Sequence, residues 1–497
     1  IANSSNLPIN LGGWDFGDGI EFKFPEQTIL DPGEHACIGA DKKDFIQAYP
    51  DARLIGTFNG NLSRSAERIV LRDSNKNPVD EIRYHDSGRW PRVADGGGST
   101  LELRDLNADN STAEAWAPSN ESNRTEWKNY SYRGRASSSG GPDSQWSEFN
   151  LGLLNAGEIL IDDISVIEDP DGQAKQILRN SNFSDDTNHW RLRGNHRHSE
   201  IIEDPQEPGN KVLRVLATSG TGHMHNQMET TLLSRVRNGT DYEISFRARW
   251  VSGTNLLHSR LYFNRLAHTT VIERPEHVGT PSEKNTAAQE NIGPTYYQLN
   301  HEPAVPNSGQ TVRVSVRADD PQGVNSMRLY YSVNGRSFKS LTMGIKGGKY
   351  YATIPAQTKK SVVQFYVRGM DEGGALSFFP SAGPDSRALY KVDDDLAATN
   401  GWHNFRIVTT NADRDFIHKE TEVMSNDRIG VTVIDRENDI YYDVKMRLKG
   451  SERARSQNPR VGYNFRFGRD QLYRGIHRSL AIDRSEGVGS GQLELLF

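Results

Sequence analysis

Cysteine is nearly absent from this chain, with Cys37 the single one among 497 residues. One thiol cannot form an internal disulfide, so packing and hydrogen bonds must stabilise the fold. No apolar run approaches the roughly 18 residues that a membrane helix needs, so we expect no membrane span in this segment. Gly-x-Ser-x-Gly and His-Glu-x-x-His motifs are also missing. We therefore assign no catalytic residues of the hydrolase type.

A strong excess of charge of one sign is missing as well. The 59 basic and 65 acidic side chains give a formal net charge of -6. A protein that binds nucleic acid needs a basic surface to neutralise phosphates. The composition thus argues against nucleic acid as the main partner, although local basic patches are compatible with it.

Short alternating strands and glycine-rich turns make up what is present. The 45 glycines and 21 prolines separate apolar-polar alternations, which is typical of β-sandwiches. A chain of 497 residues exceeds one core and predicts three to five domains. We predict a mostly β protein of tandem β-sandwiches (Ig-like, jelly roll, Ig-like), followed by the β-rich start of an α+β unit.

Residues 1–125 carry the most specific series of motifs. They include Leu11-Gly12-Gly13-Trp14, Ile69-Val70-Leu71-Arg72-Asp73 and Ala94-Asp95-Gly96-Gly97-Gly98-Ser99. The series resembles the lamin-tail domain of bacterial extracellular proteins, which is a small Ig-like sandwich. The resemblance implies that the N-terminal strand of this domain is missing from the segment.

Residues 126–275 resemble the jelly-roll carbohydrate-binding modules. The resemblance rests on phrases such as Gly157-Glu158-Ile159-Leu160-Ile161-Asp162-Asp163 and Tyr242-Glu243-Ile244-Ser245-Phe246. These describe the sandwich scaffold, and the sugar-contacting residues cannot be carried over. The resemblance implies that a glycan or a surface protein is the partner.

Two His-x-His pairs lie in this second segment. They are His196 with His198, and His223 with His225. On a β-strand, residues i and i+2 project to the same side, so two pairs on neighbouring strands would present several imidazoles together. Such a group suits a divalent zinc or copper ion. A polar groove that binds a glycan is the alternative, and both interpretations stay open.

Residues 276–301 carry turn chemistry and are predicted to be a linker. Residues 302–392, with alternations such as Met327-Arg328-Leu329-Tyr330-Tyr331-Ser332-Val333, resemble an Ig or fibronectin type III sandwich. Turns every eight to twelve residues support that class independently. We expect this module to act as a spacer.

The last segment, 393–497, resembles the start of a CotH-type kinase domain. The resemblance rests on Tyr441-Tyr442-Asp443-Val444-Lys445-Met446-Arg447-Leu448-Lys449-Gly450. It implies that Arg447 and Lys449 hold the phosphates of ATP with Mg²⁺. A nucleotide-contacting lysine of the family is replaced near Arg460, and the family's metal-binding acids would lie beyond Phe497. The resemblance thus implies a truncated domain without activity in this chain.

Two hypotheses follow. The first is a modular extracellular or cell-surface binding and structural protein, non-catalytic as given and a fragment of a larger exported bacterial chain. Assembly with neighbouring copies is compatible with it. The second is the targeting and N-lobe portion of an atypical secreted CotH-like protein kinase.

Overall fold

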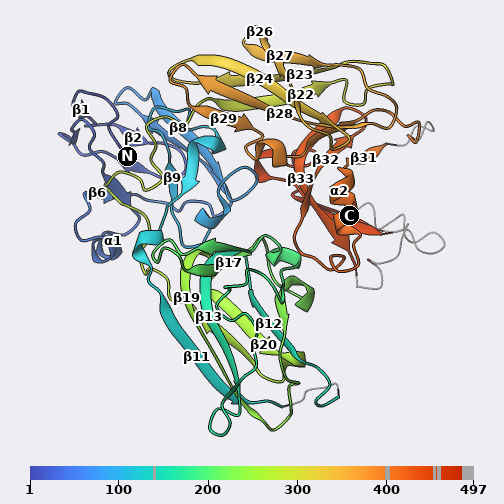
Figure 1. The fold of residues 1–497 in the computed structure, drawn as a ribbon. Helices are drawn as coiled ribbons and strands as arrows, with labels where there is room; N and C mark the ends of the chain where they lie inside the picture. The colour runs from blue at the N-terminus through green and yellow to red at the C-terminus, as the bar shows by residue number, and fades with distance from the viewer. Residues whose placement is uncertain (138–141, 398–402, 451–454, 456–460, 484–497) are drawn as a thin grey trace.

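The protein is mostly β, as predicted. The computed structural model describes residues 1–137, 142–397, 403–450, 455 and 461–483. Each of its sheets takes strands from one stretch of sequence, so the ribbon separates into four coloured regions (Figure 1). Within the described residues, no helix is both long enough and apolar enough to cross a bilayer.

The N-terminal module contains small sheets around a compact core. Its largest sheet has the order β3-β2-β7-β8, and the pairs β1-β4, β5-β6 and β9-β10 complete it. Leu11, Phe24, Leu30 and Ala36 are buried at its centre. The elements are β1 (Ile9–Asn10), β2 (Asp15–Phe16), β3 (Phe22–Lys23), β4 (Ile29–Leu30), β5 (Cys37–Gly39), α1 (Lys42–Ala48), β6 (Leu54–Thr57), β7 (Ala66–Arg72), β8 (Pro78–His85), β9 (Leu101–Leu103) and β10 (Trp116–Pro118).

The second region, the jelly roll, has two sheets packed face to face. One has the order β11-β19-β13-β17-β16 with β14 added to β13, and the other has the order β15-β18-β12-β20-β21. Alternate residues of both sheets fill the largest buried core of the molecule, around Trp250. The strands are β11 (Lys128–Arg135), β12 (Glu148–Leu153), β13 (Gly157–Glu168), β14 (Lys175–Gln176), β15 (Trp190–Arg191), β16 (Glu200–Glu203), β17 (Lys211–Ala217), β18 (Met228–Thr231), β19 (Asp241–Gly253), β20 (Leu256–Leu261) and β21 (Ala267–Val271).

The third region is a sandwich of two antiparallel sheets. Their orders are β22-β23-β27-β26 and β25-β24-β28-β29, with β30 added to β28. The strands are β22 (Thr295–Glu302), β23 (Val312–Asp319), β24 (Val324–Val333), β25 (Lys339–Thr342), β26 (Gly344–Lys346), β27 (Lys349–Ile354), β28 (Val362–Asp371), β29 (Leu376–Phe379) and β30 (Ala388–Lys391).

The C-terminal module is an antiparallel sheet of order β31-β32-β33-β34-β35. Its elements are β31 (Phe405–Val408), α2 (Asn411–Ile417), β32 (Ile429–Asp435), β33 (Asp439–Lys449), β34 (Gly462–Arg466) and β35 (Ser479–Ile482). Thr410 caps α2 because its side chain accepts from the amide of Asp413. Met446 and Leu448 of β33 are buried against the core of this module.

The segment 276–301, predicted to be a linker, is partly a strand and partly a loop that is held by another module. Its end forms β22, the first strand of the third region. Its middle is fixed to the N-terminal module, because Glu102 accepts from the hydroxyl of Thr286 at 2.7 Å and from the amide of Ala287 at 2.9 Å. Turn residues without periodicity predict a loop, but they do not reveal that a buried carboxylate elsewhere holds it.

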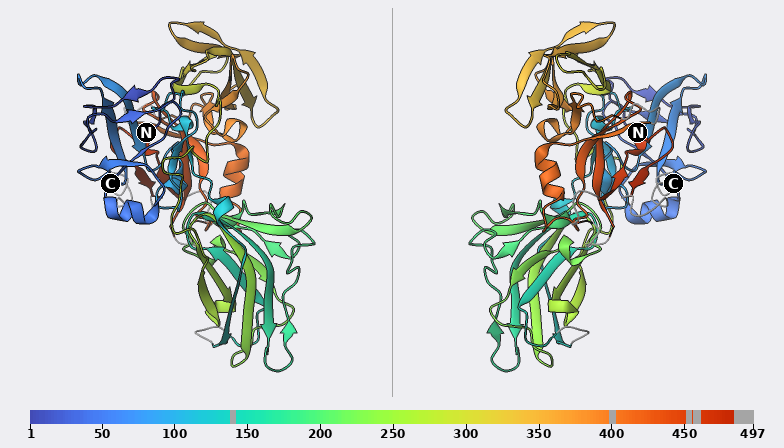
Figure 2. Two further views of the ribbon diagram at one scale, coloured as in Figure 1. Left: turned by 90° about the vertical axis from the view of Figure 1, so that its left-hand side faces the viewer. Right: turned by 90° about the vertical axis from the view of Figure 1, so that its right-hand side faces the viewer.

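The four regions contact one another along the chain and across it. The jelly roll projects away from the other three, which lie together above it (Figure 2). Arg89 of the N-terminal module and Asp470 of the C-terminal module form an ion pair at 2.9 Å. The C-terminal sheet therefore packs against modules that are hundreds of residues away in sequence.

Candidate functional site

One face of the jelly roll presents a row of polar side chains. On β12, Phe149 and Leu151 are buried in the core, so Glu148 and Asn150 point away from it. Asn150 lies opposite Arg260 of β20 and opposite Glu229 of β18. We call the side chains that this sheet, β15-β18-β12-β20-β21, directs away from the sandwich core the polar face; Asn150, Glu229 and Arg260 among them are themselves buried. Its central members are Glu148, Asn150, Arg191, Glu229, His258 and Arg260.

The charges of the polar face are paired within it. Arg260 donates to Glu148 at 3.2 Å and to Gln227 at 3.3 Å. Burial lowers the pKa of the Arg260 guanidinium, and the charge of Glu148 opposes this. Glu229 forms ion pairs with both Arg191 and Arg193. The charges of the face are thus largely balanced, and Glu148, Arg191 and His258 are its members that keep some exposure.

Three aromatic residues stand at one end of the polar face. Trp146 precedes β12, and Tyr262 and Phe263 follow β20 in the 3₁₀ turn η6 (Tyr262–Asn264). The rings of Trp146 and Tyr262 stack with centroids 5.6 Å apart and planes at 29°. The Trp146 side chain is 49% exposed and that of Phe263 is 43% exposed. We call these three residues the aromatic platform.

The turn η6 joins the aromatic platform to the polar face. Phe263 has a φ of 54°, a left-handed conformation that is uncommon for a bulky residue and clusters at functional sites. In the same turn, Asn264 accepts from Arg260 at 3.1 Å. An exposed aromatic surface beside fixed amides and charged groups suits a ligand with both apolar patches and hydroxyls.

The histidine pairs do not lie on strands, which is the arrangement that the metal interpretation requires. His196 is in the 3₁₀ turn η4 (Gly194–His196), and His225 is in the 3₁₀ turn η5 (Met224–Asn226). With three residues per turn, positions i and i+2 do not share a side. Gly194 begins the first of these turns with a φ of 59°. A side chain at this position would collide with the backbone of His225.

The four histidines have separate surroundings. His196 is fully buried, and its Nε2 accepts from the amide of Leu153 at 2.9 Å while its Nδ1–H donates to the carbonyl of Asn226. Burial lowers the pKa of His196 to about 4. His223 and His225 have ring centroids 4.9 Å apart, and His223 Nδ1 accepts from the amide of His225. Across the residues described, no three metal-binding side chains come together.

His198 belongs to the contact between the jelly roll and the C-terminal module. Its Nε2 lies 3.2 Å from the Oδ2 of Asp427, which also forms an ion pair with Arg197 and accepts from Thr218 at 2.7 Å. Arg197 also lies over the ring of Phe416, 3.9 Å from its centroid. Nothing in the His-x-His spacing indicated this role, because the partner is about 230 residues away in the sequence.

The nucleotide candidates Arg447 and Lys449 share one face of β33. Lys449 forms an ion pair with Asp483 at 2.6 Å, whereas Arg447 lies opposite Asn464 of β34. Their part in holding ATP with Mg²⁺ stays a prediction. The residues near Arg460 at which the family's lysine is replaced, and the end of the chain, lie outside the described residues.

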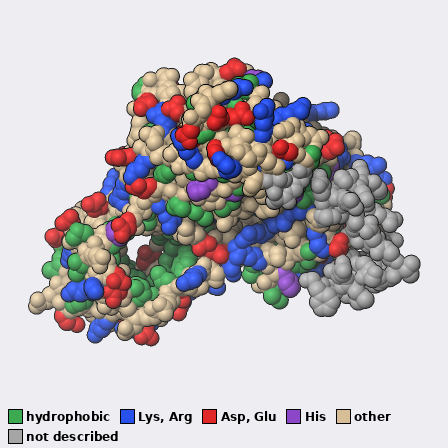
Figure 3. Space-filling view, turned by 90° about the horizontal axis from the view of Figure 1, so that it is seen from below, with side chains coloured by type: hydrophobic (Ala, Val, Ile, Leu, Met, Phe, Trp, Pro, Cys, Tyr) green, Lys and Arg blue, Asp and Glu red, His purple; other side chains and the backbone are tan. Residues whose placement is uncertain are grey.

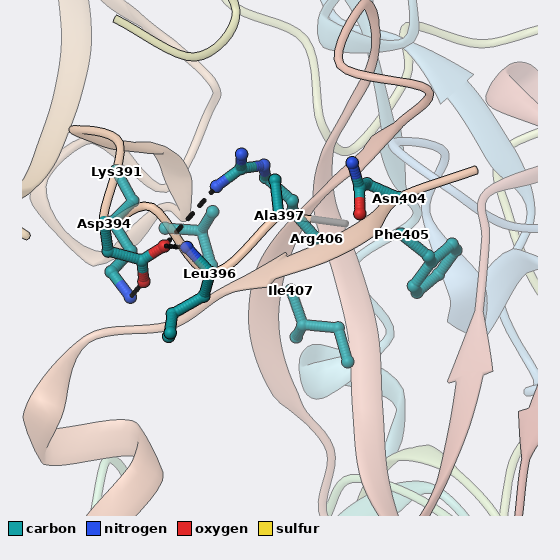
Figure 4. A pocket seen from close by; sticks show the side chains of 9 residues that line it. Lys391, Asp394, Leu396, Ala397, Asn404, Phe405, Arg406 and Ile407 are labelled. Carbon is teal, nitrogen blue, oxygen red and sulfur yellow. Dashed lines mark hydrogen bonds and ion pairs between the residues drawn. The ribbon is translucent and has the colours of Figure 1, made fainter. Parts of the chain in front are cut away.

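Two hollows lie away from the polar face. Lys391, Asp394, Phe405 and Arg406 line a pocket of about 220 Å³ at the edge of the C-terminal sheet (Figure 4). Its charges are satisfied locally, because Lys391 is paired with Asp394 and Arg406 with Glu437. The other hollow, on the β11-β19 face, includes Tyr130 and Arg247. We assign no ligand to either hollow.

Comparison with family models identifies two segments. Residues 1–86 match the Lamin Tail Domain, and residues 175–264 match a Carbohydrate binding domain. The second match covers Arg191, Glu229, Arg260 and η6, whereas Trp146 and Glu148 precede it. Neither match reaches residues 265–497, so the CotH resemblance gains no support from them.

No curated protein matches the chain. Among solved structures, the Br derivative of BhCBM56 has 9% identity and a TM-score of 0.15, over 21% of this chain and 94% of that one. The cycloalternan-forming enzyme from Listeria monocytogenes, in complex with a pentasaccharide substrate, has 12% identity and a TM-score of 0.16, over 38% of this chain and 17% of that one. Pullulanase from Bacillus acidopullulyticus has 11% identity and a TM-score of 0.12, over 51% of this chain and 33% of that one.

Scores this low carry no argument about function, and the chain spans only a minor part of the two enzymes. The family matches stand without them. The chain is a modular β protein that contains a lamin-tail-like segment at residues 1–86 and a carbohydrate-binding-like segment at residues 175–264.

Proposed function

We propose that this protein is a non-catalytic glycan-binding protein of the cell surface or the extracellular space, whose jelly roll holds the glycan. The observation that carries the proposal is that a carbohydrate-binding match ends in η6, where the aromatic platform meets the polar face. Sugar rings are apolar on one face and carry hydroxyls around their edges. A stacked Trp146–Tyr262 pair beside the exposed amide of Asn264, which the buried Arg260 holds in place, complements both features.

The charge balance of the polar face selects among glycans. Glu148 and Glu229 are each neutralised by arginines that are themselves partly buried. An acidic sugar would meet these carboxylates, and a basic one would meet the arginines. We therefore infer that the ligand of this face is a neutral oligosaccharide, bound by stacking and hydrogen bonds.

Trp146→Ala is expected to weaken binding of a neutral oligosaccharide at least about tenfold, because stacking surface is lost, with little change in stability. The best ligand from a panel of neutral glucose, xylose and mannose oligosaccharides would be titrated calorimetrically. Phe378→Ala is the matched control, since it removes a partly exposed aromatic side chain from the third region. Equal affinity for Trp146→Ala and the unmodified protein would place the ligand elsewhere.

A further inference from the structure

Basic side chains gather on the outer face of the C-terminal sheet. Met446 and Leu448 point into the core, so Lys445 and Arg447 point away from it. Arg466 of β34 lies opposite Lys445. Because Ile429 pairs with Met446, Arg428 follows the register to a place opposite Arg447. We call Arg428, Lys445, Arg447 and Arg466 the basic face.

The basic face lies where three modules meet. Arg92, in the 3₁₀ turn η1 (Arg92–Ala94) of the N-terminal module, donates to the carbonyl of Thr218 in the jelly roll at 3.0 Å. The positive charge of Arg92 also acts on Arg428. The space-filling view shows Lys and Arg side chains gathered near the centre of the molecule, beside the residues drawn in grey (Figure 3).

Carboxylate partners are missing from this cluster within the part of the chain that the structure describes. Arg428, Lys445, Arg447, Arg466 and Arg92 form no ion pair there, and Arg428 donates to the backbone carbonyl of Asn464 at 2.9 Å. Elsewhere in this module the partly buried arginines are neutralised, for example Arg406 by Glu437. Arg455, whose pKa the charge of Arg447 also lowers, likewise donates to backbone carbonyls and forms no ion pair among the described residues.

Holding these charges together has a cost that an anion would relieve. Burial lowers the pKa of Arg428 to about 10, and the positive charges of Arg447, Arg466 and Arg92 add to the effect. Burial also lowers the pKa of Arg447. Like charges in a partly desolvated place repel one another more strongly than in water, and guanidinium groups are suited to planar or tetrahedral oxyanions.

We propose that Arg428, Arg447 and Arg466 bind an acidic glycan, through sulfate or carboxylate groups repeated along its chain. Arg428 directly precedes β32, and Arg447 and Arg466 lie on the neighbouring β33 and β34. At about 4.8 Å per strand the three span roughly 10 Å, too far for one oxyanion to reach all of them at hydrogen-bonding distance. A ligand with repeated anionic groups fits this spacing. The site lies on another module than the polar face and takes a ligand of different charge, so it goes beyond the function proposed above.

The test measures binding of dextran sulfate of fixed length to the whole chain at low and at physiological salt, against uncharged dextran. Arg447→Gln with Arg466→Gln should weaken dextran sulfate binding at least about tenfold, because charge-assisted hydrogen bonds are lost. Lys42→Gln with Lys43→Gln is the matched control, since it removes two exposed positive charges from α1 of the N-terminal module. Arg466→Gln alone, at an exposed strand position, should give a smaller loss and guards against misfolding of the double variant.

Two results would overturn the proposal. One is an equal loss for the Lys42 and Lys43 control, which would show attraction by net charge only. The other is Mg-ATP or inorganic sulfate binding as tightly as dextran sulfate and displacing it, which would assign the site to a compact anion. If the polar face does not bind a neutral glycan, this test is unaffected, because Trp146→Ala should not alter dextran sulfate binding.

Discussion

Trp250→Ala is expected to destabilise the jelly roll by about 3–5 kcal/mol, the largest effect that we predict for one substitution. Trp250 is 1% exposed, at the end of β19 in the core between the two sheets. Its indole N–H donates to the carbonyl of Gly253 at 3.1 Å. Truncation would leave a large cavity and an unsatisfied carbonyl in a region that cannot collapse freely.

The same ring is also the place where the N-terminal module meets the jelly roll. A side chain at Gly98 would approach Trp250 Cζ2 to 2.7 Å, and the amide of Gly253 donates to the carbonyl of Gly97 at 2.6 Å. Loss of the indole thus removes the surface against which the Gly97–Gly98 turn packs. We expect the two modules to lose cooperativity as well as stability.

Differential scanning calorimetry of the whole chain checks this prediction. The thermal transition of the jelly roll is the one that Trp250→Ala shifts most, and urea unfolding of the same variants checks that assignment. Unfolding of several modules is not two-state, so the shift of that single transition is the quantity to compare. Trp250→Phe keeps part of the ring and should cost less than half as much. Trp146→Ala, at the surface, should leave the transition unchanged. A free energy of unfolding of the jelly roll in Trp250→Ala within about 1 kcal/mol of that in the unmodified protein would contradict the prediction.

Alternation in the sequence was enough to predict the scaffold. On β19, Ile244 and Phe246 alternate with the polar Glu243, Ser245 and Arg247, and both are buried in one core. The same rule holds for Lys445, Arg447 and Lys449, which share one face of β33. The rule works because successive side chains of a strand point to opposite faces of the sheet, and one of these faces is buried.

The candidate sites were harder to predict because they depend on long-range contacts. His196 and His198 have the i, i+2 spacing of two side chains on one face of a strand. The chain turns at Gly194 into a 3₁₀ turn, so that spacing no longer places them on one face. Asp427, which fixes His198, carries no local signal. Trp146 and Tyr262 are more than a hundred residues apart and meet only because β12 and β20 are neighbours. Sheet order decides such sites, and alternation does not encode sheet order.

Asp427→Ala is expected to weaken the contact between the jelly roll and the C-terminal module by about 2–3 kcal/mol. The Asp427 side chain is buried, and it accepts from Arg197, His198 and Thr218, all in the jelly roll. Removing the carboxylate leaves the partly exposed Arg197 and His198 without their shared partner, which is why the expected loss is below that of a fully buried pair. Hydrogen exchange of the amides at 194–199 should increase.

The pH dependence of this contact gives the sharper test. Burial alone would raise the pKa of Asp427, but the hydrogen bond of His198, the charge of Arg197 and the hydroxyl of Thr218 outweigh it and lower the pKa below its usual 3.8. A carboxylate with a lowered pKa stabilises the folded state fully above its unfolded pKa. That stabilisation disappears as the pH falls below about 4 through the folded pKa.

Glu422 titrates beside the same contact and acts in the opposite direction. It accepts from the amide of Gly194, and burial raises its pKa. Its protonation therefore favours the folded contact at a higher pH than the one at which Asp427 titrates. The difference between the unmodified protein and Asp427→Asn removes the contribution of Glu422, because both proteins contain it. Asp415→Asn controls for charge, since Asp415 is exposed and, among the described residues, forms its ion pair with the neighbouring Arg414.

We expect the exchange protection of residues 194–199 in Asp427→Asn to be lower than in the unmodified protein at pH 6, and the two curves to converge below about pH 4. Convergence is the decisive feature, because it means that the contact depends on the ionised form of this one carboxylate. Curves that stay parallel down to pH 3 would instead show that Asp427 acts through its shape and hydrogen bonds. The jelly roll would then be held to the C-terminal module mainly by the Arg197–Phe416 contact and by the Asn226 side chain, which donates to the carbonyl of Met424 and accepts from the amide of Asn426.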